Sequence, residues 1–327
     1  MDASSPIEAG AYSSPAGTLQ ARLTAIRYAA EGIHLYEFSS LDGRALPRFA
    51  AGAHVDLHLP NGLVRQYSLC NAQDEAHRYV VGIKRDPASR GGSAYLHEQL
   101  KVGTVLAIGA PRNHFALHED ASHSVLIAGG IGVTPIACMV QRLRALGASF
   151  ELHYSVRRRA EAAFLPELAG GNFHLHVDAE HGNAPLPIAA IVAGAAAGGP
   201  LQWCSPGPML DAFEAAAAGR PAGHVHLERF AAAAPVAVEG GFTVQLARAG
   251  RSLFIGKGCT ILDTLRQEGI AVQASCEQGI CGSCETRVLS GRPDHRDSLL
   301  SDDESQSNQV MMICCSGSKD PVLVLDL

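Results

Sequence analysis

The first third of the chain consists of short apolar stretches separated by turn residues. The stretches cover residues 19–28, 33–38, 55–59, 64–69, 79–84 and 104–108. Short strands at this spacing, with turn signals between them, are typical of an antiparallel barrel. We therefore predict an antiparallel β-barrel over residues 18–118, preceded by a flexible lead of polar, serine- and proline-containing sequence over residues 1–17.

The pattern changes at Ser124. Apolar runs at residues 124–128 and 150–154 alternate with helical stretches, which indicates βαβ units around a parallel sheet. An α/β domain is predicted over residues 119–230. Four alanines, Pro235 and Gly240-Gly241 then suggest a linker over residues 231–241, although the alanines could equally continue a helix until the proline stops it. Residues 242–327 are left for a small α+β domain, with a helix at 261–267 and a closing strand at 322–325.

Cysteines cluster in this last region. They follow the plant-type spacing C-x4-C-x2-C…C, which places four thiolates around a two-iron, two-sulfur cluster. The predicted ligands are Cys276, Cys281, Cys284 and Cys314. Gly279 and Gly282 lie between them, where they let the backbone fold tightly around an inorganic core and turn its amides toward the sulfurs. The motif predicts a carrier of single electrons.

Two other uses of these cysteines are a zinc site and disulfide bonds. Structural zinc usually takes two short-spaced pairs, whereas the fourth ligand here stands apart. Disulfides are disfavoured because nine cysteines in a chain without an export signal should stay reduced. The neighbouring Cys315 is an alternative fourth ligand. Cys314 is preferred because residues 312–314 resemble a strand that ends at the cluster, while Cys315 would begin the next turn.

Composition narrows the classes of function. The chain has 327 residues, enough for two or three domains, and its 47% hydrophobic and 18% charged residues are ordinary for a globular protein. A net charge of −6 gives no reason to expect nucleic-acid binding. No signal peptide and no apolar run of about 18 residues is visible, so a cytoplasmic protein without a membrane span is expected. The 15 histidines show no metal-binding spacing.

A first ligand site is predicted on the barrel. Arg65 can hold a phosphate with two hydrogen bonds, and the face of Tyr67 can cover a flavin ring. Gly91-Gly92-Ser93, before a helix expected to open at Ala94, offers backbone amides and a positive dipole end to the same anion. Each piece alone is weak, since such residues also occur in solvated strands and ordinary caps. Their occurrence in this order on one predicted barrel favours a flavin site over these separate explanations.

A second site is predicted in the α/β region. Gly129-Gly130-Ile131-Gly132 follows its first strand, where a ligand's pyrophosphate could approach the backbone. Thr134 is expected to cap the next helix and Pro135 to take its first position. The motif is incomplete, because Pro135 stands where the third glycine of G-x-G-x-x-G would be. Cys204, at the end of a later strand, is either a small buried hydrophobe or a contact of a nicotinamide.

Together these motifs resemble one family. They occur in the order seen in the phthalate dioxygenase reductase family, which includes reductase components of vanillate O-demethylase and related Rieske oxygenases. The motifs are Arg65-Gln66-Tyr67-Ser68, Gly91-Gly92-Ser93, Pro111-Arg112-Asn113, Gly129 to Pro135, Cys204 to Met209, Glu228-Arg229-Phe230 and the four cysteines. The resemblance covers the chain from about residue 19 to its end. It implies an FMN-binding barrel, an NADH-binding domain and a C-terminal plant-type (β-grasp) ferredoxin domain.

The resemblance also implies roles for individual residues. The positions expected to bind FMN are Arg65, Gln66, Tyr67, Ser68, Gly82, Lys84, Gly91, Gly92 and Ser93. The positions expected to bind the dinucleotide are Gly130, Gly132, Thr134, Pro135, Cys204 and Pro206. Ser68, Cys204 and Glu228 are expected to act at the site of hydride transfer. The chain departs from the family at Ser205, where relatives commonly have glycine.

The residues alone do not decide between NADH and NADPH. The run Arg157-Arg158-Arg159 follows a predicted parallel strand, where an adenosine ribose could be recognised. It is either a solvated charge run or a site for a 2′-phosphate. NADH is favoured only by the resemblance.

The expected function is that of a reductase component of a two-component Rieske-type aromatic oxygenase or O-demethylase. NADH supplies a hydride and the cluster takes one electron at a time, so a flavin must stand between them. The expected partner is a separate terminal Rieske oxygenase, and the chain itself is expected to be a monomer. Acidic residues near Asp302 could steer a basic partner, or could be ordinary solvated charges. The alternatives are an FAD-containing reductase of a diiron monooxygenase and a non-catalytic ferredoxin-like electron-carrier module.

Overall fold

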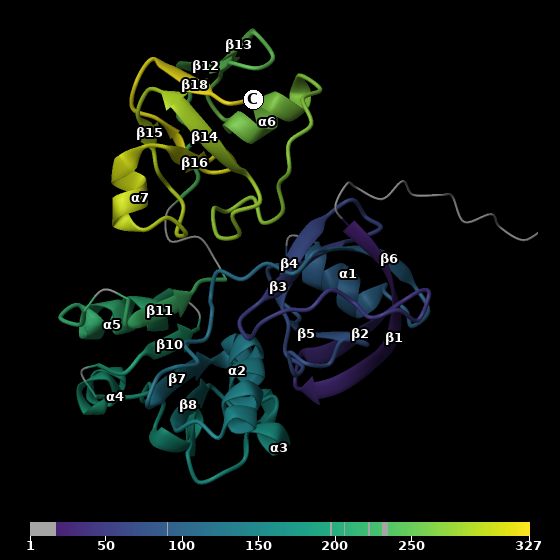
Figure 1. Cartoon of the computed structure of the whole chain (residues 1–327), viewed down its shortest axis with the longest axis vertical. Helices are drawn as coiled ribbons and strands as arrows, with labels where there is room; N and C mark the ends of the chain where they lie inside the picture. Colours follow the sequence, from purple (N-terminus) through teal and green to yellow (C-terminus); the bar gives the residue numbers. More distant parts are fainter. Residues whose placement is uncertain (1–17, 90, 197, 206, 222, 231–234) are drawn as a thin grey trace, which may run out of the picture.

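A computed structural model describes residues 18–327 except 90, 197, 206, 222 and 231–234. Figure 1 shows three bodies, each built around a sheet of its own: an N-terminal barrel, a central parallel sheet with helices, and a C-terminal body that holds the cysteines. The predicted lead at 1–17 and the four alanines of the predicted linker lie outside the described residues. In the part of the chain that is described, no helix is long and apolar enough to cross a membrane.

The first body is a six-stranded antiparallel barrel, as predicted. Its strands run in the order β4-β3-β6-β1-β2-β5, and a bridge between Leu69 and Val81 joins the two end strands. The elements are β1 (Thr18–Ala30), β2 (Ile33–Ser40), β3 (His54–His58), β4 (Val64–Ser68), β5 (Tyr79–Lys84), α1 (Gly92–Glu98) and β6 (Val105–Gly109). Closure removes the free edges that an open sheet would expose. Alternate residues such as Ala21 and Leu23 fill its buried interior.

The second body is a five-stranded parallel sheet flanked by helices, in the order β11-β10-β7-β8-β9. Its strands are β7 (Ser124–Gly129), β8 (Phe150–Val156), β9 (Phe173–Val177), β10 (Leu201–Cys204) and β11 (Val225–Glu228). Its helices are η1 (Gly130–Gly132), α2 (Val133–Leu146), η2 (Arg159–Glu161), α3 (Leu165–Leu168), η3 (Asp178–His181), α4 (Ile188–Gly194) and α5 (Gly207–Ala217). The strand order reverses between β7 and β10, and ligands of open α/β sheets bind at such a switch point.

The third body is a mixed sheet of the β-grasp type, in the order β13-β12-β18-β14-β16. Its elements are β12 (Phe242–Leu246), β13 (Arg251–Ile255), α6 (Ile261–Gln267), β14 (Glu285–Ser290), β15 (Pro293–Asp294), α7 (Asp302–Ser307), β16 (Val310–Met312), β17 (Gly317–Ser318) and β18 (Val322–Leu325). Helix α6 has the predicted bounds because Thr260 and Asp263 form a capping box at its start. The fold class predicted from sequence is thus confirmed in all three bodies.

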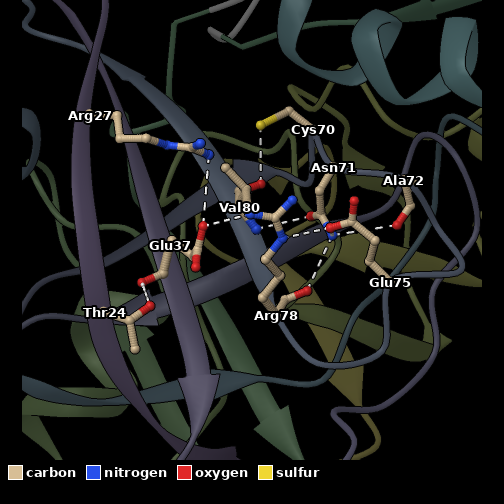
Figure 2. A network of polar contacts seen from close by, with 9 residues as sticks. All are labelled: Thr24, Arg27, Glu37, Cys70, Asn71, Ala72, Glu75, Arg78 and Val80. Atoms are coloured by element: carbon tan, nitrogen blue, oxygen red, sulfur yellow. Dashed lines mark hydrogen bonds and ion pairs between the residues drawn. The ribbon is translucent and has the colours of Figure 1, made fainter.

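A polar network fixes the connection between β4 and β5, the two strands that carry the first predicted ligand site (Figure 2). Arg78 pairs with Glu37 on β2 at 2.7 Å and with Glu75 in the connection at 2.6 Å. The Asn71 Oδ1 accepts a hydrogen bond from the Val80 amide at 2.9 Å. The connection is therefore tied both to the barrel wall and to the start of β5.

Candidate functional site

One cavity of about 270 Å³ lies where the three bodies meet. Its lining comes from the barrel, the parallel sheet and the cysteine loop together. The lining residues include Arg65, Gln66, Tyr67, Ser68, Gly82, Lys84, Gly92, Ser93, Ile131, Thr134, Glu228, Cys276, Gln278 and Ile280. Residues as far apart in the sequence as Arg65 and Ile280 thus line the same cavity. Sequence spacing alone did not reveal this.

Glycines shape the barrel side of this cavity. A β-carbon at Gly92 would lie 2.7 Å from the side chain of Arg65, so glycine lets Arg65 lie across the first turn of α1. A β-carbon at Gly82 would lie 2.6 Å from Thr134 of the parallel sheet body. Gly91 precedes α1 at φ 91°, in the left-handed region that favours glycine. Helix α1 begins at Gly92, two residues earlier than predicted, because Gly91 already turns the chain into it.

The second predicted site lies at the carboxyl ends of β7 and β10. A β-carbon at Gly132 would collide with the carbonyl of Cys204, so glycine is needed for these two chain segments to pack together. Gly130 has φ 51° and no heavy atom within 4 Å of where its β-carbon would be, which leaves its backbone open to a ligand. Cys204 is fully buried.

The predicted helix cap at Thr134 is wrong. Helix α2 begins at Val133 with Gly132 as its N-cap, and no side chain caps it. The Thr134 hydroxyl instead donates a hydrogen bond to the Ile131 carbonyl at 3.0 Å. Pro135 therefore occupies the third helical position rather than the first. Because the 3-10 turn η1 runs directly into α2, the helical path starts before the threonine.

Glu228 joins the barrel to the parallel sheet. Its Oε2 accepts a hydrogen bond from the Ser68 hydroxyl at 3.4 Å and lies 3.8 Å from the Cys204 thiol, which donates to it. Burial raises the pKa of Glu228 to about 8, and burial likewise raises the pKa of Cys204. At neutral pH the three side chains therefore form a hydrogen-bonded group without net charge.

His54, on β3, was not predicted but lines the same cavity. It is 2% exposed, and neither ring nitrogen has a hydrogen-bond partner. Burial, with the nearby Arg112 and His114, lowers the pKa of His54 to about 3. A buried polar group without a partner is costly, so this neutral imidazole fits a cavity that receives a polar ligand.

The cysteine loop has the features of a cluster cradle. The amides of Gln278 and Ile280 donate hydrogen bonds to the Cys276 sulfur at 3.3 and 3.5 Å. The four predicted ligands are all buried. Gly279 and Gly282 have φ of 70° and 72°, which turn the loop around its sulfurs. In the described residues, no three His, Cys, Asp or Glu side chains are arranged to hold a single metal ion.

Cys314 and Cys315 differ in their contacts. The Cys314 sulfur is in hydrogen-bonding contact with the sulfurs of Cys276, Cys284 and Cys315. The Cys315 thiol donates to the Met312 carbonyl at 3.6 Å. The predicted strand into the cluster is wrong, because β16 ends at Met312 and both cysteines lie in the turn that follows. The contacts nonetheless favour Cys314.

The arginine run after β8 is largely occupied by carboxylates. Arg158 pairs with Glu31 at 2.9 Å, and Arg159 pairs with Glu180 at 2.6 Å. Asp178 follows the neighbouring strand β9, and its Oδ1 accepts a hydrogen bond from the Ser155 hydroxyl at 3.4 Å. Two of the three arginines are therefore already engaged in ion pairs.

Five predicted positions do not line the cavity. They are Gly91, Gly130, Gly132, Pro135 and Cys204. Pro206 lies outside the described residues. Sequence reasoning missed His54, Asp86 and Ser89, which belong to none of the quoted motifs. It also gave no role to Ile131, which lies within the Gly129–Gly132 motif and lines the cavity.

Comparison with known proteins agrees with this geometry. Residues 245–318 match the 2Fe-2S iron-sulfur cluster binding domain. The chain is 53% identical to phenoxybenzoate dioxygenase subunit beta of Ectopseudomonas oleovorans, over 94% of this chain and 96% of that protein. It is 49% identical to tetrachlorobenzoquinone reductase of Sphingobium chlorophenolicum, over 96% of this chain and 99% of that one.

A solved structure covers the whole architecture. Phthalate dioxygenase reductase, described as a modular structure for electron transfer from pyridine nucleotides to [2Fe-2S], is 36% identical and has a TM-score of 0.73. The match covers 95% of this chain and 98% of that one. Identity and coverage of this extent, with the same three bodies in the same order, establish the relationship. The chain belongs to the phthalate dioxygenase reductase family of iron–sulfur flavoprotein oxidoreductases.

Proposed function

We propose that this protein is the reductase component of a Rieske-type aromatic oxygenase or O-demethylase system, taking hydride from NADH onto FMN and passing electrons singly through a 2Fe-2S cluster. The observation that carries the proposal is a cavity shared by the barrel, the parallel sheet and the cysteine loop. A hydride donor, a flavin and a one-electron acceptor must lie close together, and this cavity is where the three bodies converge.

The barrel side fits FMN. The Arg65 guanidinium and the backbone amides of residues 91–93 would hold its phosphate. Gln66, Tyr67, Ser68, Gly82 and Lys84 would surround its ring, beside the unpartnered nitrogens of His54. When bound, the flavin accepts two electrons together and releases them one at a time. A cavity that ends at the cysteine loop suits that role.

The parallel sheet side fits NADH. The open backbone at Gly130, with Gly132, Thr134 and Pro135 behind it, would receive the pyrophosphate. Cys204 would border the nicotinamide at the end of β10. Ser68, Cys204 and Glu228 would orient the reacting rings, since their hydrogen bonds join the two halves of the site. The proton on Glu228 keeps a carboxylate charge away from the position that receives the hydride.

Two observations support NADH over NADPH. Arg158 and Arg159 are neutralised by Glu31 and Glu180, which leaves less positive charge for a 2′-phosphate. Asp178 follows the strand next to β8, and a carboxylate there suits a ribose hydroxyl and repels a phosphate.

The cysteine loop would hold the cluster through Cys276, Cys281, Cys284 and Cys314. The amides of Gln278 and Ile280, directed at one of these sulfurs, would stabilise the added charge when the cluster is reduced. From there the electron would pass to a separate oxygenase, the kind of system that the names of the relatives describe.

A quinone is a second candidate acceptor, because one relative at 49% identity is named for tetrachlorobenzoquinone. The two acceptors make different demands on the cluster. A Rieske oxygenase needs single electrons from the cluster, whereas a quinone can take two electrons from the flavin directly.

The test uses the purified holoprotein under anaerobic conditions. The flavin released on denaturation is identified, and its reduction by NADH and by NADPH is followed together with the cluster signal in electron paramagnetic resonance. FMN, faster reduction by NADH and electron delivery to a Rieske oxygenase are expected. Release of FAD, or reduction of a quinone but of no oxygenase in a panel, would contradict the proposal.

A further inference from the structure

The Pro111-Arg112-Asn113 motif received no role from the sequence. In the structure Arg112 lies between the barrel and the cysteine loop, beside Asp56 of β3. We propose that Asp56 and Arg112 form a latch that positions the cluster loop on the flavin barrel and sets the reduction potential of the cluster. The inference rests on the proposed function and assigns positioning residues to it.

Asp56 is the first half of the latch. Its carboxylate belongs to a residue only 6% exposed, at the barrel surface that faces the cysteine loop. Oδ1 accepts a hydrogen bond from the Ser275 hydroxyl at 2.8 Å, and Oδ2 accepts one from Arg112 at 2.7 Å. Ser275 directly precedes Cys276, so one carboxylate joins the barrel to a predicted cluster ligand.

Arg112 is the second half. The nitrogen that binds Asp56 also donates to the Ser283 hydroxyl at 3.0 Å. Ser283 in turn accepts a hydrogen bond from the Cys281 thiol at 3.3 Å. Where a thiolate replaces that thiol, the serine hydroxyl can donate to it instead. A chain of polar contacts thus runs from Asp56 through Arg112 and Ser283 to a second predicted ligand.

The backbone that carries Arg112 is held rigidly. Its amide and carbonyl pair with His54 on β3, at 3.0 and 2.9 Å. Asn113 accepts a hydrogen bond from the Phe115 amide at 2.9 Å and donates one to the Ala51 carbonyl at 3.0 Å. The motif is therefore a fixed platform on the barrel, from which one arginine reaches the loop.

The charges of the latch have a predictable effect on the cluster. Reduction adds negative charge, which a nearby guanidinium stabilises and a nearby carboxylate opposes. Arg112 and Asp56 are both sheltered at this junction, with side chains 34% and 8% exposed, so solvent screens them only in part. Removing the cation should lower the reduction potential, and removing the anion should raise it.

The experiment compares holoprotein variants Arg112→Gln, Arg112→Lys, Asp56→Asn and Ser283→Ala. Arg292→Gln is the matched control, because Arg292 forms an ion pair with Asp320 elsewhere on the cysteine domain. The cluster potential is measured by anaerobic titration with electron paramagnetic resonance. The rate of flavin-to-cluster transfer is measured by stopped flow, and hydrogen exchange is followed over residues 275–284.

The potential should fall in Arg112→Gln, rise in Asp56→Asn, and return toward that of the unaltered protein in Arg112→Lys. Transfer to the cluster should slow by about tenfold in Arg112→Gln, equivalent to about 1.4 kcal/mol in the activation free energy. Ser283→Ala should slow it with less change in potential, and exchange of residues 275–284 should increase in the slowed variants.

Potentials that shift in the same direction in Arg112→Gln and Asp56→Asn, or transfer rates equal to that of Arg292→Gln, would overturn the latch. If Asp56→Asn fails to fold, the comparison of cluster potential and transfer rate between Arg112→Gln and Arg112→Lys still tests the latch. Flavin reduction by NADH should be unchanged in every variant. Failure of the unaltered protein to bind flavin and cluster would instead refute the proposed function.

Discussion

Glu228 connects two domains through hydrogen bonds and is also a proposed residue of the hydride-transfer site. It lies at the contact between the barrel and the parallel sheet, where its only described hydrogen-bond donors are the neutral Ser68 and Cys204. Burial therefore favours the protonated carboxyl at neutral pH. The same burial makes the carboxyl a sensor of pH near the reacting rings.

The pH dependence of hydride transfer should report on Glu228. Flavin reduction by NADH is expected to slow as the pH rises through about 8, because ionisation places a negative charge where the hydride arrives. Glu228→Gln should abolish this dependence while keeping the hydrogen bond from Ser68. Stopped-flow rates from pH 6 to pH 10 would check it, and a Glu228→Gln profile that still falls in this range would argue against the assignment.

The raised pKa of Glu228 also makes the free energy of unfolding depend on pH. Burial raises the pKa of Glu228 from its ordinary value of 4.5 to about 8 in the folded protein, so folding becomes less favourable as the pH rises from 4.5 to 8. Glu228→Gln should therefore stabilise the protein at pH 9 relative to pH 4. Thermal unfolding at the two pH values would measure this, and equal shifts at both would contradict it.

Cofactor choice is also set at the residue scale. Asp178→Ser should lower the preference for NADH over NADPH by about tenfold, roughly 1.4 kcal/mol, because it removes the carboxylate that we propose to accept a hydrogen bond from the ribose and to repel a 2′-phosphate. The ratio of kcat/KM for the two nucleotides is the measurement. Asp42→Ser, an exposed barrel position, is the control and should leave the ratio unchanged. An unaltered ratio in Asp178→Ser would remove Asp178 from the site.

At the scale of elements, the connection between β4 and β5 supports the predicted flavin strands. Arg78→Ala breaks two partly buried ion pairs, with Glu37 and Glu75, and should cost about 2 kcal/mol. Denaturation followed by flavin fluorescence would measure the loss. Arg44→Ala, which removes an ion pair of an 86% exposed arginine, should have little effect. Equal losses in the two variants would contradict a structural role for the network.

The same network makes this connection sensitive to acid. A hydrogen bond from Arg78 lowers the pKa of Glu75 below its ordinary value. A carboxylate with a lowered pKa stabilises the fold above its unfolded pKa, and that contribution is lost as the pH falls through the folded pKa. The difference in stability between Arg78→Ala and the unaltered protein should therefore shrink in acid.

The element pattern was predictable, while the element ends were less so. The strands of the barrel and helix α6 follow from apolar spacing and a capping box, which are local signals. Thr134 failed as a cap because a 3-10 turn continues directly into α2. The strand expected to reach Cys314 ended at Met312, because that loop turns toward the other cysteines. The backbone path next to each end, rather than the residue type at the end, decided where the element stopped or started.

At the scale of the whole molecule, the order of electron flow can be tested. Cys281→Ala should abolish electron delivery to cytochrome c and to an oxygenase, while NADH still reduces the flavin, because the cluster lies after the flavin in the chain of carriers. Steady-state cytochrome c reduction and anaerobic flavin bleaching would be compared. Unchanged cytochrome c reduction would contradict this order, and retained quinone reduction would favour direct release of electrons from the flavin.

The sequence alone determined the three kinds of domain, their order and the four cysteines, because apolar periodicity and ligand spacing are local properties of the chain. Only the tertiary structure brought Arg65, Glu228 and Ile280 to one cavity and joined Asp56 and Arg112 to the cysteine loop. Those contacts depend on how three separately folded sheets pack together. No periodicity encodes such packing, because the partners of each residue lie in another body of the molecule.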